Sequence, residues 1–344
     1  MTDMAAQSVS EEERDPRFIH PEGVGWPEYV ENYRPGGFHP VHINDDLDDG
    51  RYRIMHKLGH GESSTVWLAR DKVAKKWVAL KIVDAKRSTW LMEQKSALLG
   101  ASLGHFETQY LAMELRHFEF EGPNGRHVCL VLPVLGPSTA ELSDGLGRRL
   151  KPETARQPSF QAAAAVAELH SLGFCHGNVS TEHLLLSICN VDDVGEDQIY
   201  QMLGRPTIGL LETESGEQTG PEAPRYIVKR VDFMALPHNI MQSEIRLIDF
   251  ERCFPTMSPP AELLDEVRPN TAPEVVVGHA PSAASDVWSL GCCVLRVRSG
   301  ESEFSPSMDA NTPQVCRPFS GRHTRKVAEG LVVEFRRMAN EGLQ

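Results

Sequence analysis

The sequence lacks the cysteine and histidine patterns that would indicate a disulfide framework or a zinc site. Its seven cysteines are an odd number and form no C-x-x-C pair, and Cys292 and Cys293 are adjacent. The fourteen histidines show no spacing typical of metal ligands. We therefore expect reduced cysteines and a reducing, intracellular compartment.

Long apolar runs and an excess of positive charge are also missing. No apolar stretch approaches the length of about 20 residues that a membrane-spanning helix needs, and the acidic run Glu11 to Glu13 does not fit a signal peptide. The formal net charge of −13 argues against nonspecific binding to nucleic acid. Acidity of this kind indicates either a face for basic partners or ordinary solvated loops.

The first part of the chain predicts a small lobe behind an irregular N-terminal region. Residues 1–17 are polar and acidic, and we expect them to be disordered. Residues 18–50 form a lead-in segment rich in Pro, Gly and Asp. Alternating apolar residues over 51–135 predict an antiparallel sheet, and the apolar spacing over 88–100 predicts one helix.

The second part predicts a larger, mainly helical lobe over residues 136–300. A helix is expected over 158–172, with Pro158 at its start. Residues 187–243 are polar and too long for an ordinary loop, which favours an insert. Residues 301–344 form a divergent C-terminal segment, in which one amphipathic helix is expected over 326–340.

The stretch Ile245 to Phe250, I-R-L-I-D-F, predicts a short strand that delivers Asp249 to its end. A carboxylate there can hold a magnesium ion near a phosphate. This weak signal gains weight from four partners in a fixed order: a glycine-rich turn at Gly59, V-A-L-K ending at Lys81, a His-Gly-Asn turn at His176, and A-P-E ending at Glu274. In that order they form the signature set of a protein kinase.

The segment from Gly59 to Val66 reads G-x-G-x-x-S-x-V. Its two glycines allow backbone N–H groups to approach phosphate oxygens, although a lone G-x-G is often only a hairpin turn. Lys81 ends an apolar strand, where an ammonium needs phosphates or a carboxylate, and Glu93 on the next helix is the expected partner. The alternative is a surface lysine on an edge strand.

The segment from His176 to His183 lies where kinases have H-R-D-L-x-x-x-N, and it departs from that pattern twice. Asn178 replaces the aspartate that accepts the substrate proton. An amide is not basic near neutral pH, and losing general-base help costs on the order of a hundred- to ten-thousandfold in rate. His183 replaces the asparagine that holds a second magnesium, an ion that prefers oxygen ligands. Glu182 is a neighbouring carboxylate, one residue out of register.

Two further positions bear on the same region. Glu251 replaces the glycine of D-F-G and removes conformational freedom from the start of the activation segment. Asp286 stands at the expected start of a helix. It is predicted to bind backbone amides of the His176 turn, or to act as a plain N-cap.

Three stretches together resemble the serine/arginine-rich-protein-specific kinases: E-N-Y-R-P-G-G-F-H-P-V from Glu31, R-Y-R-I-M-H-K-L-G-H-G from Arg51, and H-F-E-F-E-G-P-N-G from His117. The resemblance runs from about residue 28 to 304 and implies an α+β, bilobal protein-kinase-like fold. It also implies the use of ATP and Mg²⁺, phosphorylation of serine in Arg/Ser-rich splicing factors, and a cytoplasmic and nuclear location. We expect a monomer that binds Arg/Ser-rich proteins and binds neither nucleic acid directly nor a membrane.

The resemblance also assigns roles by position. The predicted catalytic residues are Asn178, Lys81, Glu93 and Asp249, and the predicted metal ligands are Asp249 and His183. The predicted nucleotide-binding residues are Leu58, Gly59, Gly61, Val66, Ala79, Lys81, the gatekeeper Leu132 and the hinge residue Leu135. The large lobe looks truncated, because the family adds further helices after Gly300 and an arginine that pairs with Glu274.

Three functions fit this pattern. The favoured one is an ATP-binding pseudokinase that binds Arg-rich partners or a related kinase. The second is an active serine/threonine kinase that uses Glu182 or substrate positioning in place of the missing base. The third is a decayed copy that folds poorly.

Overall fold

The computed structural model describes residues 17–25, 27–95, 108–146, 152–189, 191–236, 240–260 and 270–299. These fall into two compact units. Unit 1 holds the described residues up to Glu93 together with 116–131 and 194–231, and unit 2 holds the remainder. Of the disordered tail expected over 1–17, the structure describes only Arg17, which pairs with Glu31 at 2.9 Å. The rest of that tail and the segment expected over 301–344, with its helix, lie outside the described residues.

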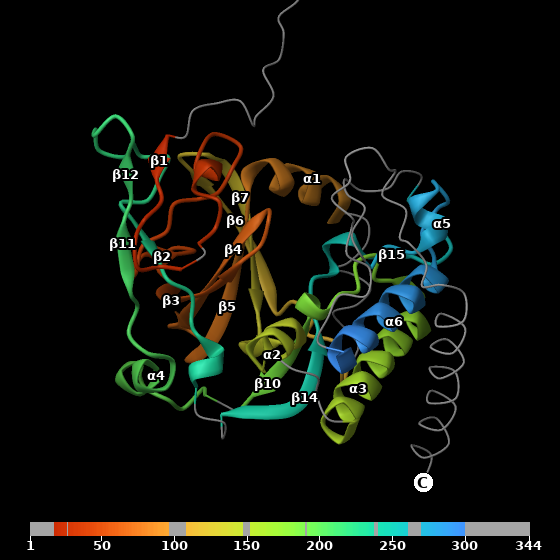
Figure 1. Ribbon diagram of the computed structural model, residues 1–344. Coiled ribbons are helices and arrows are strands. Elements are labelled where there is room, and N and C mark those ends of the chain that lie inside the picture. The colour runs from red at the N-terminus through yellow and green to blue at the C-terminus, as the bar shows by residue number, and fades with distance from the viewer. Residues whose placement is uncertain are drawn as a thin grey trace, which may run out of the picture. The chain divides into compact units, whose positions relative to one another are not determined.

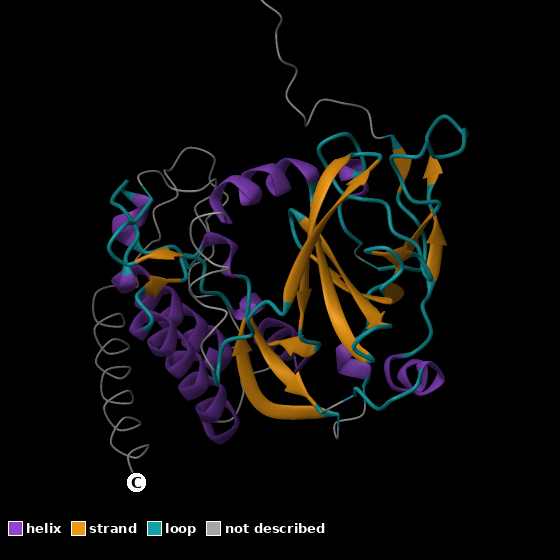
Figure 2. Cartoon of the chain, turned by 180° about the vertical axis from the view of Figure 1, so that it is seen from behind, coloured by secondary structure: helices purple, strands orange, loops and turns teal. Residues whose placement is uncertain are grey.

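Unit 1 is built on a six-stranded sheet, in which strands that follow one another in the chain and pair do so antiparallel (Figures 1 and 2). In spatial order the strands are β2 (Asp46–Leu47), β3 (Tyr52–His60), β4 (Ser64–Asp71), β5 (Lys76–Val83), β7 (Gly125–Leu132) and β6 (Arg116–Gly122). Helix α1 (Ala85–Lys95) follows β5, and the Asp84 carboxylate accepts the Arg87 N–H at 2.6 Å at its start. The predicted small lobe of antiparallel strands and one helix is confirmed.

The lead-in and the insert pack against each other in unit 1. Strand β1 (Phe18–Ile19) pairs with β12 (Glu212–Thr213), and β11 (Ile208–Leu210) pairs with β13 (Tyr226–Val228). Helix α4 (Glu196–Leu203) precedes them, and a 3-10 helix covers Val30–Asn32. One buried apolar cluster spans both segments: Phe18, Val24, Val30, Tyr33, Phe38, Leu211, Ala223 and Ile227.

This arrangement differs from the sequence prediction, which made 18–50 an irregular lead-in and assigned the whole insert 187–243 to the large lobe. The structure groups 194–231 with unit 1 and gives both segments buried side chains. The physical reason is that each segment contributes only a few apolar residues. Their partners lie about 190 residues away in the sequence, so no local period marks them.

Side chains of the β6–β7 turn and of β5 connect these segments to the sheet. The Asn124 side-chain amide donates to the Phe38 carbonyl at 2.6 Å and to the Glu222 carbonyl at 2.7 Å. The Trp77 indole N–H donates to the Val194 carbonyl at 2.9 Å. The turn between β6 and β7 therefore also holds the lead-in and the insert together.

A buried ion pair fastens the lead-in to β3. Glu28 and Lys57 are 2% and 1% exposed, and the Lys57 ammonium donates to one carboxylate oxygen of Glu28. The Tyr33 hydroxyl donates to the other oxygen at 2.6 Å, and the ammonium lies 5.3 Å from the centre of the Trp67 ring. All the charge in this site is thus matched, which is the condition under which a buried pair is tolerated.

We expect Glu28→Gln to lower the free energy of unfolding by about 3–5 kcal/mol, because it leaves the Lys57 ammonium buried without its counter-ion. The double variant Glu28→Gln/Lys57→Met should recover most of that loss. Urea unfolding followed by tryptophan fluorescence measures both. The exposed Asp46–Arg53 pair, at 3.1 Å, is the matched control, and its removal should cost less than about 1 kcal/mol. Equal losses at the two pairs would contradict this account.

Three histidines of unit 1 are held neutral by the fold. Burial and then the neighbouring His127 lower the pKa of His39 to about 3. The His39 ring lies edge-on to Phe120 at 4.8 Å and to His127 at 5.1 Å. Burial also lowers the pKa of His56 and of His127. Protonation therefore favours the unfolded chain at these positions.

Stability should fall as the pH drops below about 6.5, because the unfolded chain then takes up protons that the folded chain rejects. The expected slope is about 1.4 kcal/mol per pH unit for each such histidine. His39→Gln removes one side chain that takes up a proton when the chain unfolds. The unfolding free energy of this variant should therefore vary less steeply between about pH 6 and pH 4. Urea unfolding across this range tests the prediction. Above pH 7 the two proteins should show parallel curves, and parallel curves in acid as well would refute it.

The described residues of unit 2 combine a small sheet with four α-helices. Strands β14 (Met241–Leu247), β10 (Leu184–Ile188) and β8 (Leu135–Ser138) form an antiparallel sheet, and β15 (Phe254–Pro255) pairs with β9 (Phe174–Cys175). The helices are α2 (Thr139–Leu146), α3 (Pro152–Ser171), α5 (Pro273–Val276) and α6 (Ala283–Ser299), and short 3-10 helices cover Thr181–His183, Phe233–Ala235 and Phe250–Arg252. Helices α3 and α6 lie side by side (Figures 1 and 2).

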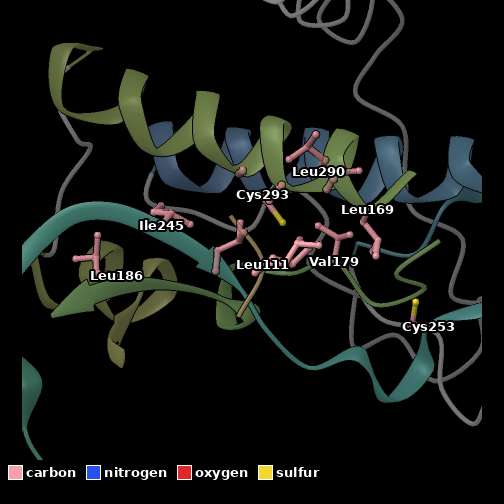
Figure 3. Close-up of a cluster of buried hydrophobic side chains, with 13 residues drawn as sticks. Leu111, Leu169, Val179, Leu186, Ile245, Cys253, Leu290 and Cys293 are labelled. Carbon is pink, nitrogen blue, oxygen red and sulfur yellow. The ribbon is translucent and has the colours of Figure 1, made fainter. Parts of the chain in front are cut away.

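The core of unit 2 lies between these two helices and the sheet. Figure 3 shows this cluster, with Leu290 and Cys293 of α6 and Leu169 of α3 on the helix side and Ile245 on β14. The predicted strand that delivers Asp249 is confirmed, since β14 ends at Leu247. No helix among the described residues is long and apolar enough to cross a membrane.

Helix α3 begins earlier than the sequence predicted. Pro158 was expected at its first turn, where a missing N–H costs nothing, yet it lies inside the helix. The helix loses the hydrogen bond that residue 158 would donate to the Thr154 carbonyl. The charged and polar residues before Pro158 extend the helix toward its N-terminus. Strand β14 also begins inside the segment predicted as insert.

Candidate active site

The glycine-rich turn joins β3 to β4 in unit 1. The Gly61 N–H donates to the Ser64 carbonyl at 2.8 Å and closes the turn. Across the sheet, Gly59 pairs with Val66, and Val66 pairs with Lys81. The register therefore brings the predicted phosphate lysine into one row with the predicted nucleotide loop.

The predicted nucleotide-binding residues of β4 and β5 share one face of the sheet. Val66 is opposite Lys81, and Leu68 is opposite Ala79, so these side chains point to the same side. The residues that alternate with them, Trp67, Leu80 and Ile82, belong to the buried core on the other side. Leu58 lies at an irregularity in the β3–β4 register, between Lys57 and Gly59. The pleat thus separates these core residues from the predicted nucleotide-binding residues.

For three of the predicted positions, these contacts do not test the predicted role. Glu93 lies on α1, as expected, but its side chain is outside the described set, so its pairing with Lys81 stays a prediction. Leu132 ends β7 and Leu135 begins β8, and both are half-buried. Their roles as gatekeeper and hinge residues also stay predictions.

In unit 2 the carboxylate of Asp286 holds the turn that contains His176. Asp286 is 2% exposed and lies in the first turn of α6. One of its oxygens accepts the His176 N–H at 2.7 Å, and the other accepts the Gly177 N–H at 2.9 Å. The predicted binding of backbone amides by Asp286 is confirmed. The His170 ring is a third partner, with Nε2 2.9 Å from Oδ2.

His170, Cys175 and Asp286 form a cluster that resembles a metal site, because their potential ligand atoms lie within 4.8 Å of one another. The carboxylate already accepts two backbone N–H groups. Burial raises the pKa of the Cys175 thiol, which disfavours the thiolate that a metal needs. The cluster is therefore a hydrogen-bonded support for the turn.

His176 connects the turn to the strand that carries Asp249. Its ring is fully buried, and Nε2 donates to the Ile248 carbonyl at 2.9 Å. Its other nitrogen, Nδ1, accepts the Asn178 N–H at 3.2 Å. Burial, and then the nearby His183, lower the pKa of His176, so the ring is neutral with one donor and one acceptor.

His183 and Asp249 are in direct contact. His183 Nε2 lies 3.1 Å from Asp249 Oδ2, and His183 Nδ1 lies 2.8 Å from the Asn178 carbonyl oxygen. The backbone is joined at the same place, because the Ile248 N–H donates to the His183 carbonyl at 3.0 Å. The structure thus brings together three of the predicted site residues of unit 2: Asn178, His183 and Asp249.

Asp249 has a left-handed backbone, with φ 68° and ψ 63°. Aspartate tolerates this conformation better than most residues, at a cost of about 1–2 kcal/mol. Glu251 lies in the following 3-10 helix and is not among the residues with positive φ. Position 251, where D-F-G has its glycine, therefore needs no glycine in this conformation. The positive φ lies at Asp249, two residues earlier.

Glu182 is tied to α6 by an ion pair that the sequence did not reveal. Its carboxylate accepts from Arg296 Nη1 at 2.6 Å, with side chains 54% and 27% exposed. Burial raises the pKa of Glu182, but the charge of Arg296, the backbone and hydrogen bonds from Arg296 and Ser180 lower it by more. The only sequence signal for this pair is a basic residue in the last turn of α6.

Glu274 also has a partner in unit 2. The Ser285 hydroxyl donates to Glu274 Oε1 at 3.4 Å. The arginine that the resemblance pairs with this glutamate is not needed for that contact.

The side chains of Asp249 and His183 fit one magnesium ion better than two. Asp249 offers a carboxylate, the ligand type that magnesium prefers. Each ring nitrogen of His183 lies within hydrogen-bond distance of a protein oxygen, Asp249 Oδ2 on one side and the Asn178 carbonyl on the other. Its predicted role as a metal ligand stays a prediction, and this geometry does not support it.

We expect Asp286→Asn to expose the His176 turn to exchange. The amide can accept only on one side, so at least one of the two backbone N–H groups loses its partner, at a cost of about 1–3 kcal/mol. Hydrogen exchange at the His176 and Gly177 amides should accelerate. His170→Gln is the matched control, because it leaves both hydrogen bonds from the backbone amides to Asp286 in place. Unchanged exchange in Asp286→Asn would show that the carboxylate does not hold the turn.

Comparison with known proteins agrees with these motifs. No family model matches the chain. The chain is 33% identical over 210 residues to protein kinase dsk1 of Schizosaccharomyces pombe, covering 59% of this chain and 38% of that protein. It is 29% identical over 290 residues to serine/threonine-protein kinase SRPK of Physarum polycephalum, covering 81% and 67%. Human SRSF protein kinase 3 is 39% identical over 110 residues, covering 30% and 19%.

The chain thus spans 38% of the length of dsk1, and it spans 24% of serine/threonine-protein kinase SKY1 of Saccharomyces cerevisiae. Among solved structures, a crystallised kinase domain matches with a TM-score of 0.54 and 20% identity, covering 77% of this chain and 68% of that one. This likeness shows the predicted α+β, bilobal kinase-like fold. In its kinase motifs and in these relatives, the chain is similar to the serine/arginine-rich-protein-specific kinases.

Proposed function

We propose that the chain is an ATP-binding member of this family whose own phosphoryl transfer is impaired and which acts as a binding module for Arg/Ser-rich proteins. One observation carries the proposal. The position of the proton acceptor is Asn178, and the nearest carboxylate of the same turn, Glu182, is ion-paired with Arg296 at 2.6 Å. Among the described residues of this turn, no other carboxylate is present.

Glu182 is a poor substitute for the missing base for two reasons. Its net pKa lies below the ordinary value, so its carboxylate is a weaker base than a typical glutamate. Its ion pair with Arg296 would also have to break before the carboxylate moved toward a substrate hydroxyl. Both effects oppose proton transfer.

The nucleotide-binding part of the proposal rests on unit 1 and on Asp249. The Gly59–Gly61 turn and the shared face of Val66, Ala79 and Lys81 support binding of a nucleoside triphosphate. Asp249 would hold one magnesium ion, which neutralises phosphate charge when it is bound. Nothing in these elements requires Asn178 to be an aspartate.

The partner follows from charge and from the relatives. A net charge of −13 attracts arginine-rich segments. One relative is named an SRSF protein kinase, and we infer that this chain binds the same chemical class, repeats of arginine and serine. We further propose that it is found in the cytoplasm and the nucleus, as the resemblance implies.

An active serine/threonine kinase is the second candidate, because Lys81 and Asp249 are retained. Phosphoryl transfer depends mainly on positioning and electrostatics, which an amide at position 178 leaves partly intact.

Single-turnover transfer from labelled MgATP to an Arg-Ser repeat peptide distinguishes the two candidates. We expect Asn178→Asp to transfer phosphate on the order of a hundredfold or more faster than the wild type, because it restores the base. Lys81→Ala should lose nucleotide affinity in a separate binding assay. Glu182→Gln should leave the slow wild-type rate unchanged.

Each outcome decides between the candidates. Wild-type transfer that Lys81→Ala abolishes would make the chain an active kinase, and its further loss in Glu182→Gln would identify Glu182 as the base. Nucleotide binding without transfer in the wild type, with transfer gained in Asn178→Asp, supports the proposal. Absence of nucleotide binding, together with non-cooperative melting, would favour a decayed copy.

A further inference from the structure

Strand β11 of the insert turns large aliphatic side chains toward solvent. Ile208 and Leu210 are 50% and 66% exposed, whereas Gly209 between them is buried. Successive side chains of a strand point to opposite faces, so the two aliphatic residues share the outer face. The inner face carries only the hydrogen of Gly209. This is the reverse of the usual pattern, in which a strand buries its apolar side chains.

The lead-in closes the inner face and fixes this orientation. A Cβ atom at Gly209 would lie 2.7 Å from the Glu22 carbonyl oxygen and 3.1 Å from the Pro21 Cβ atom. The next inward residue, Leu211, belongs to the buried cluster shared with the lead-in. A slip of one residue would bring an aliphatic side chain to the place of Gly209, where there is no room for it. The outer face is therefore a constant feature of unit 1.

The outer face continues into β12 with acidic residues. Strands β11 and β12 follow one another along one margin of unit 1 (Figure 1). Glu212 and Glu214 take the next alternating positions, and both are exposed. Ile19 of β1 is paired with Glu212 and is 43% exposed, so it shares this face. We call this set the β11–β12 stripe: Ile19, Ile208, Leu210, Glu212 and Glu214.

The chemistry of the stripe selects among possible occupants. No ion pair joins Glu212 or Glu214 to another residue that the structure describes, and the neighbouring Arg17 is paired with Glu31 at 2.9 Å. Two unneutralised carboxylates favour a basic partner and, with a net charge of −13, disfavour a second copy of the chain. Exposed apolar side chains beside polar ones are typical of an interaction site. Repeats of arginine and serine have no aliphatic side chains to cover them.

We propose that the β11–β12 stripe is a docking surface for a protein segment that carries two aliphatic residues next to two basic ones. The aliphatic side chains cover Ile208 and Leu210, and the basic ones pair with Glu212 and Glu214. An extended segment with this pattern at alternating positions matches the spacing of the stripe. The inference goes beyond the proposed function, because it requires neither nucleotide nor an Arg/Ser-rich partner.

The test selects random peptides displayed on phage against the full chain and measures the affinity of the selected peptides by fluorescence anisotropy. We expect them to carry two aliphatic and two basic residues at alternating positions. Ile208→Thr/Leu210→Thr, which keeps good strand formers, should weaken binding by about tenfold or more. Glu212→Gln/Glu214→Gln should weaken binding and reduce its dependence on salt.

Val73→Thr is the matched control, because Val73 is 70% exposed in the turn after β4 and lies outside the stripe. Its affinity for the selected peptides should equal that of the wild type. A selection that yields no such peptides would overturn the inference, as would affinities that neither double variant changes.

Two other occupants are outcomes of the same experiment. If the wild type forms dimers in sedimentation and Ile208→Thr/Leu210→Thr does not, a second copy covers the stripe and the inference is wrong. If an Arg-Ser repeat peptide displaces the selected peptides, the stripe belongs to the Arg/Ser-binding site, and a separate partner is excluded. Loss of Arg-Ser binding elsewhere, with peptide binding intact, would contradict the proposed function alone.

Discussion

The buried carboxylate of Asp286 is the interaction on which the rest of the candidate site depends. It accepts the backbone N–H groups of His176 and Gly177 and so fixes the start of the turn. From there the His176 ring reaches Ile248, one residue before Asp249. Each step of this support joins a buried side chain to a main-chain group. Asn178 contributes its backbone N–H and carbonyl to the network, and an aspartate at this position would offer the same two groups.

This separation between support and chemistry explains how a kinase fold persists while its catalytic residues change. The buried network of Asp286 and His176 is costly to disturb, since each unsatisfied amide costs about 1–3 kcal/mol. The residues that would touch substrate or metal are half-buried or exposed, and their side chains carry less of the fold. A substitution at Asn178 or His183 therefore changes the reaction more than it changes stability.

Local patterns in the sequence predicted the parts of the molecule that are built from neighbours in the chain. The antiparallel strands of unit 1 and the strand before Asp249 follow from apolar alternation, and the role of Asp286 follows from a motif. The packing of the lead-in against the insert could not be predicted in this way, because their cluster joins a few apolar residues from each of two distant segments. Arg296 was missed for a similar reason. A basic residue near the end of a helix is ordinary, and only the fold brings it to Glu182.

The departure at residue 178 changes the electrostatics of the predicted catalytic turn. The kinase pattern places two carboxylates in this region, one for the substrate proton and one for metal, beside a neutral amide. In this chain Asp249 keeps one carboxylate and Asn178 supplies a neutral amide, while a ring nitrogen of His183 lies 3.1 Å from Asp249 Oδ2. The nearby carboxylate of Glu182 is paired with Arg296. The protein charge beside Asp249 is therefore less negative than in the kinase pattern, which lowers its attraction for a divalent ion.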